Sequence, residues 1–307
     1  MNVNNSKAVE FLLARGNLPI LYWLKRDILE VPVERELKNL EKFAARIRIL
    51  ETQNPNGSWC KKRPATQPCW EKTYNIIETL KNLQRLYDFG GTSELEGVRK
   101  AVNFLFSTQT KAGDFRGIYP NDYSPSYQAL ALEILCRLSL DKDRRVQKGF
   151  RWILKNRQEN GGWGSPSRQF AVRSRSFSRL VTGMVLRALA ESPSWRKRKE
   201  GLTAGQLLLT HFFRPDQVED TQETSEWEKM SYPYWSADIL SSLDALSKLG
   251  FQADDHENIR RALDWLLRRQ NKYGFWESGN KKASFEDHLW VTLAVLKVLK
   301  RFGALQG

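Results

Sequence analysis

Cysteine and histidine are scarce in this chain of 307 residues, which has three of each. The cysteines are Cys60, Cys69 and Cys136. An odd and sparse set predicts a reducing compartment, which we take to be the cytoplasm, and no disulfide framework. Neither Cys60 nor Cys69 has a clear histidine partner in the sequence, so no metal site is expected there. We expect no cofactor, and leave zinc and magnesium open.

Long apolar runs are also missing. No stretch of about 18 apolar residues occurs, which predicts that no helix spans a membrane. The first residues lack a basic segment followed by an apolar block, so they do not read as a signal peptide. No convincing strand pattern is present either, which favours an all-helical chain.

Acidic residues are too few to balance the basic ones. There are 49 Lys and Arg against 35 Asp and Glu, a net charge of +14. Such an excess attracts polyanions such as nucleic acid, anionic lipid or diphosphate, although a basic protein without such a partner is the alternative. Aromatic residues are plentiful, with 11 Trp, 15 Phe and 9 Tyr, and they suffice for a packed core.

One polar turn recurs along the chain. It reads QNPNGSW from residue 53, QTKAGDF from 109, QENGGWG from 158 and QNKYGFW from 270. In each copy a glycine follows the Gln by four residues, and an aromatic follows it by five or six. Because glycine makes up about 7% of residues, four matched glycines have a chance likelihood on the order of one in 10⁵. The chain is therefore a repeat protein.

The spacing of these turns predicts five repeat units. The Gln positions lie 56, 49 and 112 residues apart, and the last gap is twice the first. The segment LLLTHFFRPDQ fills that gap, with His211 where a Gln is expected. Each unit begins with an amphipathic helix such as IRRALDWLLRRQ, and a more apolar helix such as FEDHLWVTLAVLKVLKRFG follows the turn. Two further helices are expected at about 6–15 and 18–30.

These units predict an all-α fold, an α/α toroid. We expect a single ring of about five helical hairpins over residues 40–307, and an N-terminal helical extension over residues 1–39. The second helices are apolar on most faces, which favours an inner layer around a central cavity. An open solenoid would need polar end caps, and the last helix is too apolar to serve as one.

The phrase QxxxGxW, repeated between paired helices over residues 40–303, resembles the QW motif of squalene and oxidosqualene cyclases. The alternating helices are also similar to the toroid of protein prenyltransferase β subunits. This resemblance implies that the Gln amide binds backbone at a helix end, near the aromatic residue of its own turn. We therefore interpret the repeated residues as structural, namely Gln53, Trp59, Gln109, Phe115, Gln158, Trp163, Gln270 and Trp276.

The catalytic motifs of that family are not found here. The DxDD motif with which squalene–hopene cyclases protonate an alkene is absent, as is the DCTAE of oxidosqualene enzymes. Asp238 and Asp244 are the nearest inner-helix carboxylates, with a different spacing. Prenyltransferases hold zinc with an Asp, a Cys two residues later and a His. His288 resembles that His in place, but Leu240 stands two residues after Asp238. No metal site is predicted, and whether the chain is an enzyme stays open.

Two groups of residues are predicted to line a central cavity. The inner helices would begin at one mouth of the ring, where their N-terminal amides favour an anion. The basic candidates at this mouth are Lys61, Lys62, Arg63, Arg173, Arg175 and Arg179. The aromatic candidates, early on inner helices, are Trp70, Tyr74, Tyr127, Trp235 and Trp290. A cationic mouth above aromatic walls suits a prenyl diphosphate, whereas solvated loops and packed aromatics are the structural alternative.

Two residues are candidates for catalysis. Asp238 lies on an inner helix with apolar or small neighbours, where a raised pKa would suit a general acid. A hydrogen bond to a neighbouring Ser or Tyr is the structural alternative. His288 could act as acid, base or ligand. It does not form a dyad with Asp287, because adjacent helix residues point apart.

The predicted function is the binding or conversion of an isoprenoid-type apolar ligand in the central cavity, with a prenyl diphosphate as one version. A non-enzymatic interaction scaffold and a polyanion-binding protein are the alternatives, and the basic run at 196–199 suits nucleic acid. A cavity of several hundred Å³ would favour a ligand or an enzyme, and a filled centre would favour the scaffold.

Overall fold

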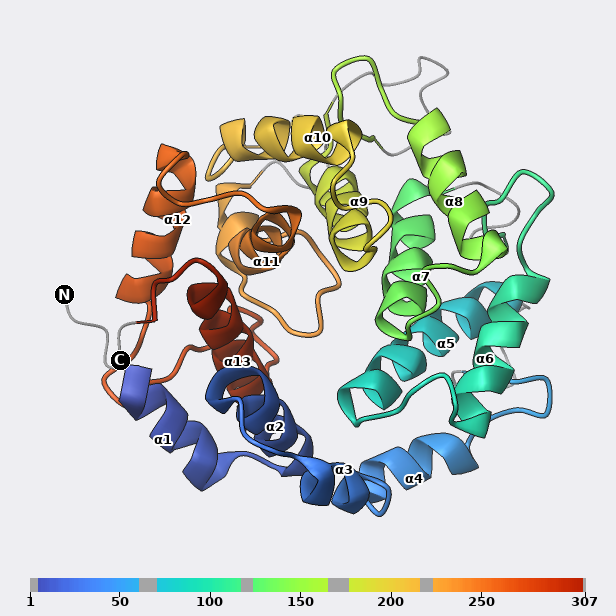
Figure 1. Ribbon diagram of the computed structural model, residues 1–307, viewed down its shortest axis with the longest axis horizontal. Coiled ribbons are helices and arrows are strands. Elements are labelled where there is room, and N and C mark those ends of the chain that lie inside the picture. The colour runs from blue at the N-terminus through green and yellow to red at the C-terminus, as the bar shows by residue number, and fades with distance from the viewer. Residues whose placement is uncertain (1–4, 61–70, 117–123, 165–176, 216–222, 306–307) are drawn as a thin grey trace.

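The computed structural model describes residues 5–60, 71–116, 124–164, 177–215 and 223–305. Over these residues the secondary structure is helical, apart from one isolated bridge between Gln109 and Phe115. Figure 1 shows the helices arranged around a ring. The all-α toroid predicted from the sequence is confirmed.

The ring has two layers, and the chain alternates between them (Figure 1). The outer layer holds α1 (Asn5–Arg15), α4 (Ala44–Glu51), α6 (Glu96–Ser107), α8 (Arg144–Lys155), α10 (Lys199–Thr210) and α12 (Glu257–Arg268). The inner layer holds α2 (Leu18–Leu24), α5 (Glu71–Asp88), α7 (Pro125–Arg137), α9 (Arg179–Glu191), α11 (Ile239–Leu249) and α13 (Phe285–Arg301). Three short elements connect them: the π-helical turn η1 (Lys25–Leu29), α3 (Glu34–Leu40) and the 3-10 helix η3 (Thr224–Glu228).

The composition of each helix explains its layer. In α11, nine of eleven residues are buried, because the helix packs against α9 and α13 and faces the centre. In α12, only four of twelve are buried, and Ile259, Ala262, Leu263 and Leu266 form its apolar stripe. The apolar and amphipathic patterns in the sequence therefore separate the inner helices from the outer ones.

The N-terminal helices complete the ring. The five expected hairpins correspond to α4–α5, α6–α7, α8–α9, α10–α11 and α12–α13. Helices α1 and α2 form a further outer–inner pair, and both pack against α13. The indole Nε1 of Trp23 in α2 also donates a hydrogen bond of 2.7 Å to the backbone oxygen of Asp88, at the end of α5. The fifth hairpin therefore meets the first one through residues of the N-terminal extension.

Two of the repeated turns fasten their outer helix to the next one through the Gln amide. Gln53 Nε2 donates hydrogen bonds of 2.9 Å to the backbone oxygen of Gly57 and of 2.8 Å to that of Gly97 in α6. Gln109 makes the equivalent bonds to Gly113 and to Arg145 in α8, at 2.8 and 2.9 Å. These contacts confirm that the amides bind backbone at helix ends, as the resemblance implied.

In three of the four turns a tryptophan ties the turn to the outer helix of its own unit. The indoles of Trp59, Trp163 and Trp276 donate from Nε1 to the backbone oxygens of Ile49, Ile153 and Leu266, at 2.7 to 2.9 Å. All three indoles are at most 2% exposed. Their bonds satisfy carbonyl groups at the ends of the outer helices, which would otherwise lack partners.

The third turn has a different register from the one predicted. The glycine in the left-handed conformation is Gly161, with φ of +92°. Its backbone oxygen accepts a hydrogen bond of 2.8 Å from Nε of Arg157. Arg157 therefore stands where the other turns have their Gln, four residues before the glycine, and Gln158 is one residue too late for that role. The adjacent glycines at 161 and 162 conceal the register in the sequence. With this correction, the aromatic residue follows by six positions in all four turns.

His211 also differs from its predicted place. It is the C-cap residue of α10. In other units the C-cap residue is Thr52 or Thr108, which lies one position before the Gln of the turn. Its ring stacks on Phe177, with centroids 4.0 Å apart. The fourth outer helix therefore ends without the polar turn residue of the other repeats.

Candidate functional site

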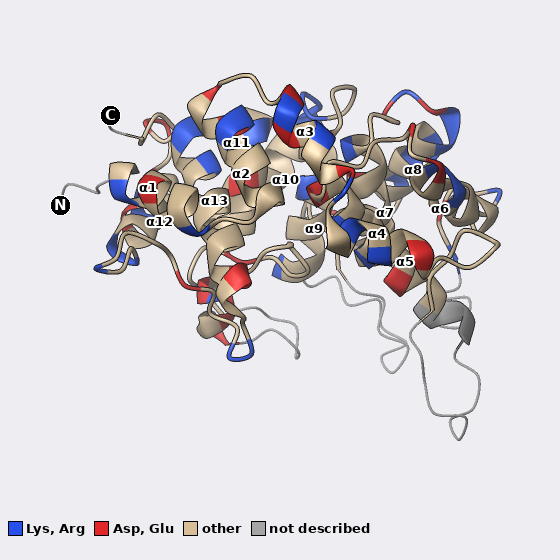
Figure 2. Cartoon of the chain, turned by 90° about the horizontal axis from the view of Figure 1, so that it is seen from below, with Lys and Arg blue, Asp and Glu red and all other residues tan. Residues whose placement is uncertain are grey.

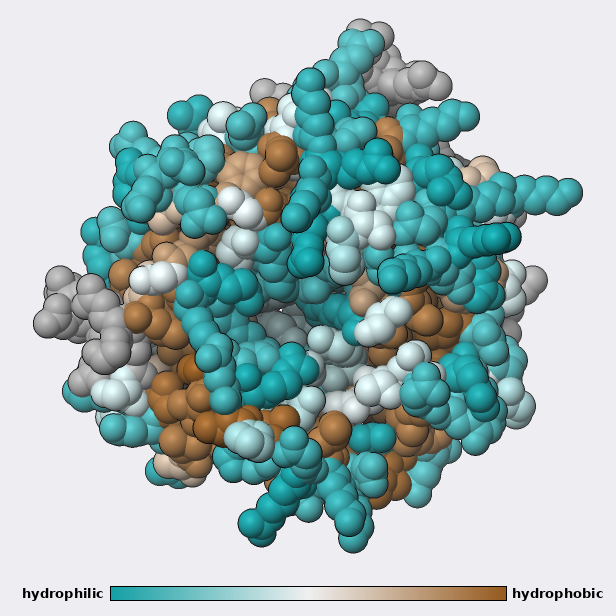
Figure 3. Space-filling view, in the orientation of Figure 1, coloured by the Kyte–Doolittle hydropathy of each residue, from teal (hydrophilic) through white to brown (hydrophobic). Residues whose placement is uncertain are grey.

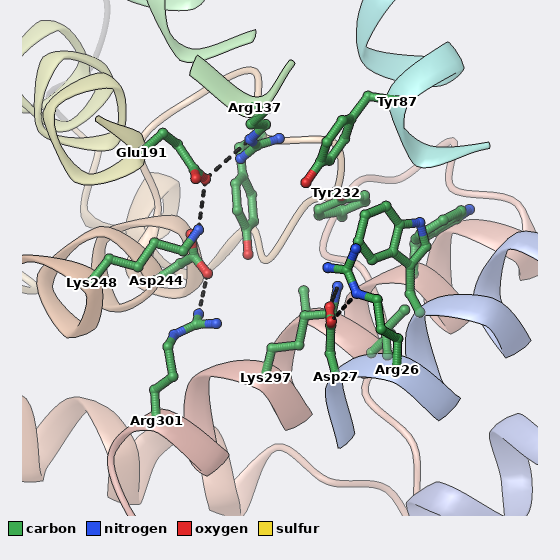
Figure 4. A pocket seen from close by; sticks show the side chains of 15 residues that line it. Arg26, Asp27, Tyr87, Arg137, Glu191, Tyr232, Asp244, Lys248, Lys297 and Arg301 are labelled. Carbon is green, nitrogen blue, oxygen red and sulfur yellow. Dashed lines mark hydrogen bonds and ion pairs between the residues drawn. The ribbon is translucent and has the colours of Figure 1, made fainter. Parts of the chain in front are cut away.

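A cavity of about 290 Å³ lies where the inner helices end. Figure 4 shows charged side chains pointing into it from several helices, and Figure 3 shows a hollow with hydrophilic residues around it at the centre of one face of the ring. We call it the charged cavity. Its lining residues are Trp23, Arg26, Asp27, Tyr87, Arg137, Glu191, Tyr232, Tyr234, Asp244, Lys248, Trp290, Leu293, Ala294, Lys297 and Arg301.

A chain of ion pairs crosses one side of the charged cavity. Arg137 of α7 contacts Glu191 of α9 at 3.1 Å. Lys248 of α11 contacts Glu191 and Asp244, each at 2.7 Å. Arg301 of α13 pairs with the same Asp244. Four neighbouring inner helices are thereby joined at their C-terminal ends, where cations are also favoured by the helix dipole.

The chain of ion pairs continues into the core through Glu133. This carboxylate lies between Arg137, at 2.7 Å, and Arg187, at 3.1 Å, and it is 4% exposed. Arg187 also donates to the backbone oxygens of Ser236 and Tyr234 at 2.7 and 2.9 Å. These bonds hold the segment before α11 in place.

The opposite side of the charged cavity comes from η1 and α13. Asp27 pairs with Arg26, at 2.6 Å, and with Lys297, at 2.7 Å. Both cations also lie over the indole of Trp23, at 3.9 and 4.6 Å from a ring centroid. The N-terminal segment therefore supplies one side of the site, so ring closure and site formation are coupled.

The charges shift the pKa values of their neighbours. Burial by itself would raise the pKa of Asp244, but Lys248 and Arg301 outweigh it and lower that pKa. Lys248 and Arg137 likewise overcome burial and lower the pKa of Glu191. Both carboxyl groups are therefore ionised at neutral pH, and they act as fixed acceptors for the cations.

A buried acid lies behind the aromatic side of this cavity. Asp88, which is 3% exposed, accepts hydrogen bonds from the hydroxyl of Tyr232 at 2.7 Å and from Gln84 Nε2 at 3.1 Å. Burial raises the pKa of Asp88 to about 6, against the lowering effect of the Tyr232 bond and of Arg137. Burial also raises the pKa of Tyr87 to about 12. Asp88 is thus a carboxyl group that titrates near neutral pH.

A second cavity, of about 750 Å³, shares Trp290 with the first. We call it the aromatic cavity. Its lining residues are Phe43, Ala45, Arg48, Ile49, Thr52, Asn54, Trp59, Cys60, Glu78, Asn82, Arg85, Asp88, Phe89, Pro233, Ser284, Glu286, Asp287 and Trp290. Trp290 stacks on Tyr232 with centroids 5.3 Å apart, so one aromatic pair separates the two cavities.

The repeat and the ring agree with a known family. The prenyltransferase alpha-alpha toroid domain matches residues 12–192 and 209–306, which is most of the chain. The chain belongs to this family. Within the toroid family, squalene–hopene cyclase of Bradyrhizobium diazoefficiens is 23% identical over 245 residues, covering 70% of this chain and 35% of that protein. The chain thus spans about a third of the length of this curated relative.

The chain is also similar to solved structures of other proteins. A polysaccharide lyase is 9% identical, with 99% of both chains covered and a TM-score of 0.53. A variant of the type II terpene cyclase MstE from Scytonema, in complex with geranylgeranyl dihydroxybenzoate, is 14% identical over 89% of this chain and 100% of that chain, with a TM-score of 0.48. At these identities the lyase likeness shows the toroid fold alone, and the chemistry must be argued from the site.

The aromatic candidates have different environments in this toroid. Trp290 is 7% exposed and lines both cavities. Trp235 is 37% exposed and lines a small pocket of about 20 Å³ with Leu80, Gln84 and Leu130. Tyr127 is half-buried against the core, in the first turn of α7. Trp70 and the side chain of Tyr74 lie outside the described residues.

The predicted cationic mouth lies mostly in undescribed segments, which contain Lys61, Lys62, Arg63, Arg173 and Arg175. Arg179 is described, and it is 2% exposed. It donates to the backbone oxygen of Ala237 and lies over the indole of Trp227, so it packs between inner helices. Figure 2 shows Lys and Arg on both ends of the ring. The described cation cluster lies at the C-terminal ends of the inner helices, opposite to the predicted mouth.

The two catalytic candidates lie away from the charged cavity. Asp238 is fully buried and caps α11, because its carboxylate accepts from the backbone of Ser241 at 2.8 Å and of Ser231 at 3.0 Å. Burial raises the pKa of Asp238, against these bonds. His288 is half-buried in α13, where its Nδ1 accepts from the backbone of Ser278 at 3.0 Å. Their catalytic roles stay predictions.

Neither a metal cluster nor a membrane helix is found in the part of the chain that the structure describes. No three His, Cys, Asp or Glu side chains there are grouped as a metal would require. None of the described helices has the length and apolar character needed to cross a bilayer.

Sequence reasoning missed most residues of the charged cavity. Arg137, Glu191, Lys248 and Arg301 all lie in the last turns of apolar inner helices, and that shared position is the available signal. In one helix alone, such a charge resembles an ordinary helix-end residue. The four helix ends come together only when the ring closes, so the charged cluster cannot be seen in any single repeat.

Proposed function

We propose that the protein binds an isoprenoid-type apolar ligand in the aromatic cavity. The observation that carries this proposal is the volume of about 750 Å³ together with walls formed by Phe43, Trp59, Phe89, Pro233 and Trp290. A volume in this range suits a small-molecule ligand, and apolar walls favour an apolar chain. Membership in the prenyltransferase toroid family supports the choice of an isoprenoid.

The charge of the aromatic cavity favours a neutral ligand over a prenyl diphosphate. Among the described residues, its lining contains the acids Glu78, Asp88, Glu286 and Asp287 and the cations Arg48 and Arg85. An anionic head group beside four acids would be repelled unless cations compensated for them. A diphosphate on the ligand would therefore need the basic residues of the undescribed loops, or the charged cavity beyond Trp290.

Conversion of the ligand would require an acid, and Asp88 is better placed for this than Asp238. Asp88 lines the aromatic cavity, whereas Asp238 caps a helix and lines neither cavity. Its raised pKa keeps a fraction of its carboxyl protonated near pH 6, and Tyr232 holds the group in place. We propose Asp88 as the proton donor if the bound isoprenoid is protonated at an alkene.

The proposal is tested by what the protein retains from a lipid extract. The purified chain is incubated with the extract, re-isolated and examined by mass spectrometry, and an isoprenoid is expected in the bound fraction. Trp290→Leu should lower its recovery several-fold, while Trp265→Leu, on the outer helix α12, should not. Recovery of no isoprenoid, together with steeply salt-dependent binding of nucleic acid, would favour the polyanion-binding alternative instead.

Conversion is tested separately with the recovered ligand. Asp88→Asn should bind it and abolish any turnover, because an amide cannot donate a proton as an acid does. Asp238→Asn keeps one oxygen that can cap α11 but places an amide nitrogen where the second carboxylate oxygen accepts from the backbone of Ser231. It should therefore reduce the stability of the fold, and turnover per folded molecule should persist. Turnover that survives in Asp88→Asn but disappears in folded Asp238→Asn would restore the role predicted for Asp238.

A further inference from the structure

The charged cavity has more cations than acids. Arg26, Arg137, Lys248, Lys297 and Arg301 line it, against three acids, so five minus three leaves an excess of two positive charges. Glu133 and Arg187, which lie behind Arg137, neutralise each other and do not change this excess. Asp88, behind Tyr232, reduces the excess to one when it is ionised. The side chains of the site therefore do not neutralise one another.

Each acid in this cavity is already paired with two cations. Glu191 Oε1 accepts from both Arg137 and Lys248. Asp244 accepts from Lys248 at one oxygen and from Arg301 at the other. Asp27 is shared by Arg26 and Lys297. An anionic ligand would therefore bind through the donors of the site.

Donor groups with capacity remain on both sides. A lysine has three N–H groups, and the contacts above use two on Lys248 and one on Lys297. The hydroxyls of Tyr87 and Tyr234 line the cavity, and none of the described residues accepts a hydrogen bond from them. Figure 4 shows the Tyr87 hydroxyl pointing toward the space that Arg137, Lys248, Arg301 and Lys297 surround.

We propose that the charged cavity binds a dianionic phosphate group. An anion is favoured because the cations of the cavity outnumber its acids even when Asp88 is ionised, and the several oxygens of a phosphate can accept from ammonium, guanidinium and phenol donors at once. The volume of about 290 Å³ admits the group together with part of an organic substituent. The competing explanation is that the cations only offset the carbonyl ends of the inner helices.

The test is a titration of the 307-residue chain with inorganic phosphate at pH 8, measured by calorimetry at constant ionic strength. Inorganic diphosphate and a phosphate monoester form further arms, which distinguish free phosphate from a substituted one. Saturable binding of one phosphate per chain is expected. Malonate, a dicarboxylate of the same charge, should bind at least about 10-fold more weakly, because its oxygens are divided between two separated carboxylate groups, whereas those of phosphate surround one atom.

Matched variants locate the site. Arg301→Met should weaken phosphate binding roughly 10-fold, since it removes a charged donor, whereas Arg268→Met on the exposed face of α12 should leave it unchanged. Tyr87→Phe should weaken it roughly 5-fold with little effect on stability without phosphate, because that hydroxyl has no described acceptor. Tyr273→Phe, 63% exposed, is its control.

Three outcomes would overturn the proposal. In the first, no phosphate binds and Arg301→Met only destabilises the protein, which would show that the cations only offset the carbonyl groups at the helix ends. Equal loss in Arg301→Met and Arg268→Met would indicate non-specific attraction to a basic chain. Tighter binding of malonate than of phosphate would refute the assignment of ligand chemistry. None of these results depends on isoprenoid recovery, so the two proposals fail independently.

Discussion

The hydroxyl of Tyr232 donates a hydrogen bond of 2.7 Å to the carboxylate of Asp88, across 144 positions of the sequence. Tyr232 precedes α11 and Asp88 ends α5, so this bond spans the centre of the ring. Trp290 stacks on the same tyrosine. The contact places a buried acid at the boundary between the two cavities, and its titration can be measured.

Asp88→Asn should change how stability depends on pH. The folded pKa of about 6 lies above the ordinary value of 3.8, so the folded state binds more protons between these values. The free energy of unfolding contributed by this group therefore falls as pH rises from about 4 to about 6, by about 3 kcal/mol. Asn retains an acceptor for Tyr232 and removes this dependence. Denaturant unfolding at pH 4 and pH 8 measures the difference.

The control for this prediction is Asp264→Asn, at an exposed position of α12. It should follow the pH profile of the unmodified chain. An unchanged profile in Asp88→Asn would show that Asp88 is already ionised at pH 4 in the folded protein.

Gly274→Ala should loosen the closure of the ring. Gly274 has φ of +92°, and a Cβ there would lie 2.7 Å from Lys7 Cβ in α1. Gly303 also has a positive φ, of +67°, but has nothing within 4 Å. We expect a loss of about 1 kcal/mol for Gly303→Ala from backbone strain alone, and about 2 kcal/mol or more for Gly274→Ala. Hydrogen exchange should accelerate in α1 only for the latter.

If both glycine variants lose the same stability, and exchange in α1 is unaffected, the repeated turn does not hold α1. The ring would then be closed by the contacts of α1 and α2 with α13.

Arg157→Gln tests the corrected register of the third turn. The Gln should replace Arg157 as donor to the Gly161 oxygen, as Gln53 and Gln109 do in their own turns. Stability should stay within about 0.5 kcal/mol, whereas Arg157→Leu should lose about 1 kcal/mol with the hydrogen bond. Thermal unfolding of the two variants gives the comparison. Equal losses in both would mean that Arg157 stabilises the turn by charge or packing.

The fold could be predicted from the sequence because a repeat contains both the pattern of an outer helix and the turn that ends it. The period-3.6 pattern of segments such as 259–267 predicts an outer helix, and the turn at Gly274 predicts where it ends. The N-terminal helices were expected, but their place in the ring was not. Nothing local in the segment from 5 to 29 indicates which helix it will meet, since its partner α13 is almost 280 residues away.

The candidate site was less accessible from the sequence. Trp290 was identified because an aromatic early on an apolar helix is a local pattern. Asp88 was not, because its raised pKa depends on burial by segments far away in the chain. Asp238 looked like an acid in an apolar setting, and only the coordinates show the two backbone amides that it caps. Solvation and partners decide such roles, and neither is written in local sequence.

Glu133→Gln should destabilise the ring more than any surface change. Glu133 is buried between the guanidinium groups of Arg137 and Arg187, which belong to neighbouring inner helices. Loss of the negative charge leaves two buried cations that repel each other, and breaking a buried ion pair costs about 3 kcal/mol or more. Denaturant unfolding should show this loss, while Glu94→Gln, in an exposed loop, should change stability by less than about 0.5 kcal/mol. A loss below about 1 kcal/mol in Glu133→Gln would mean that water or a shifted acid reaches these arginines, and that the charged cavity extends deeper than Arg137.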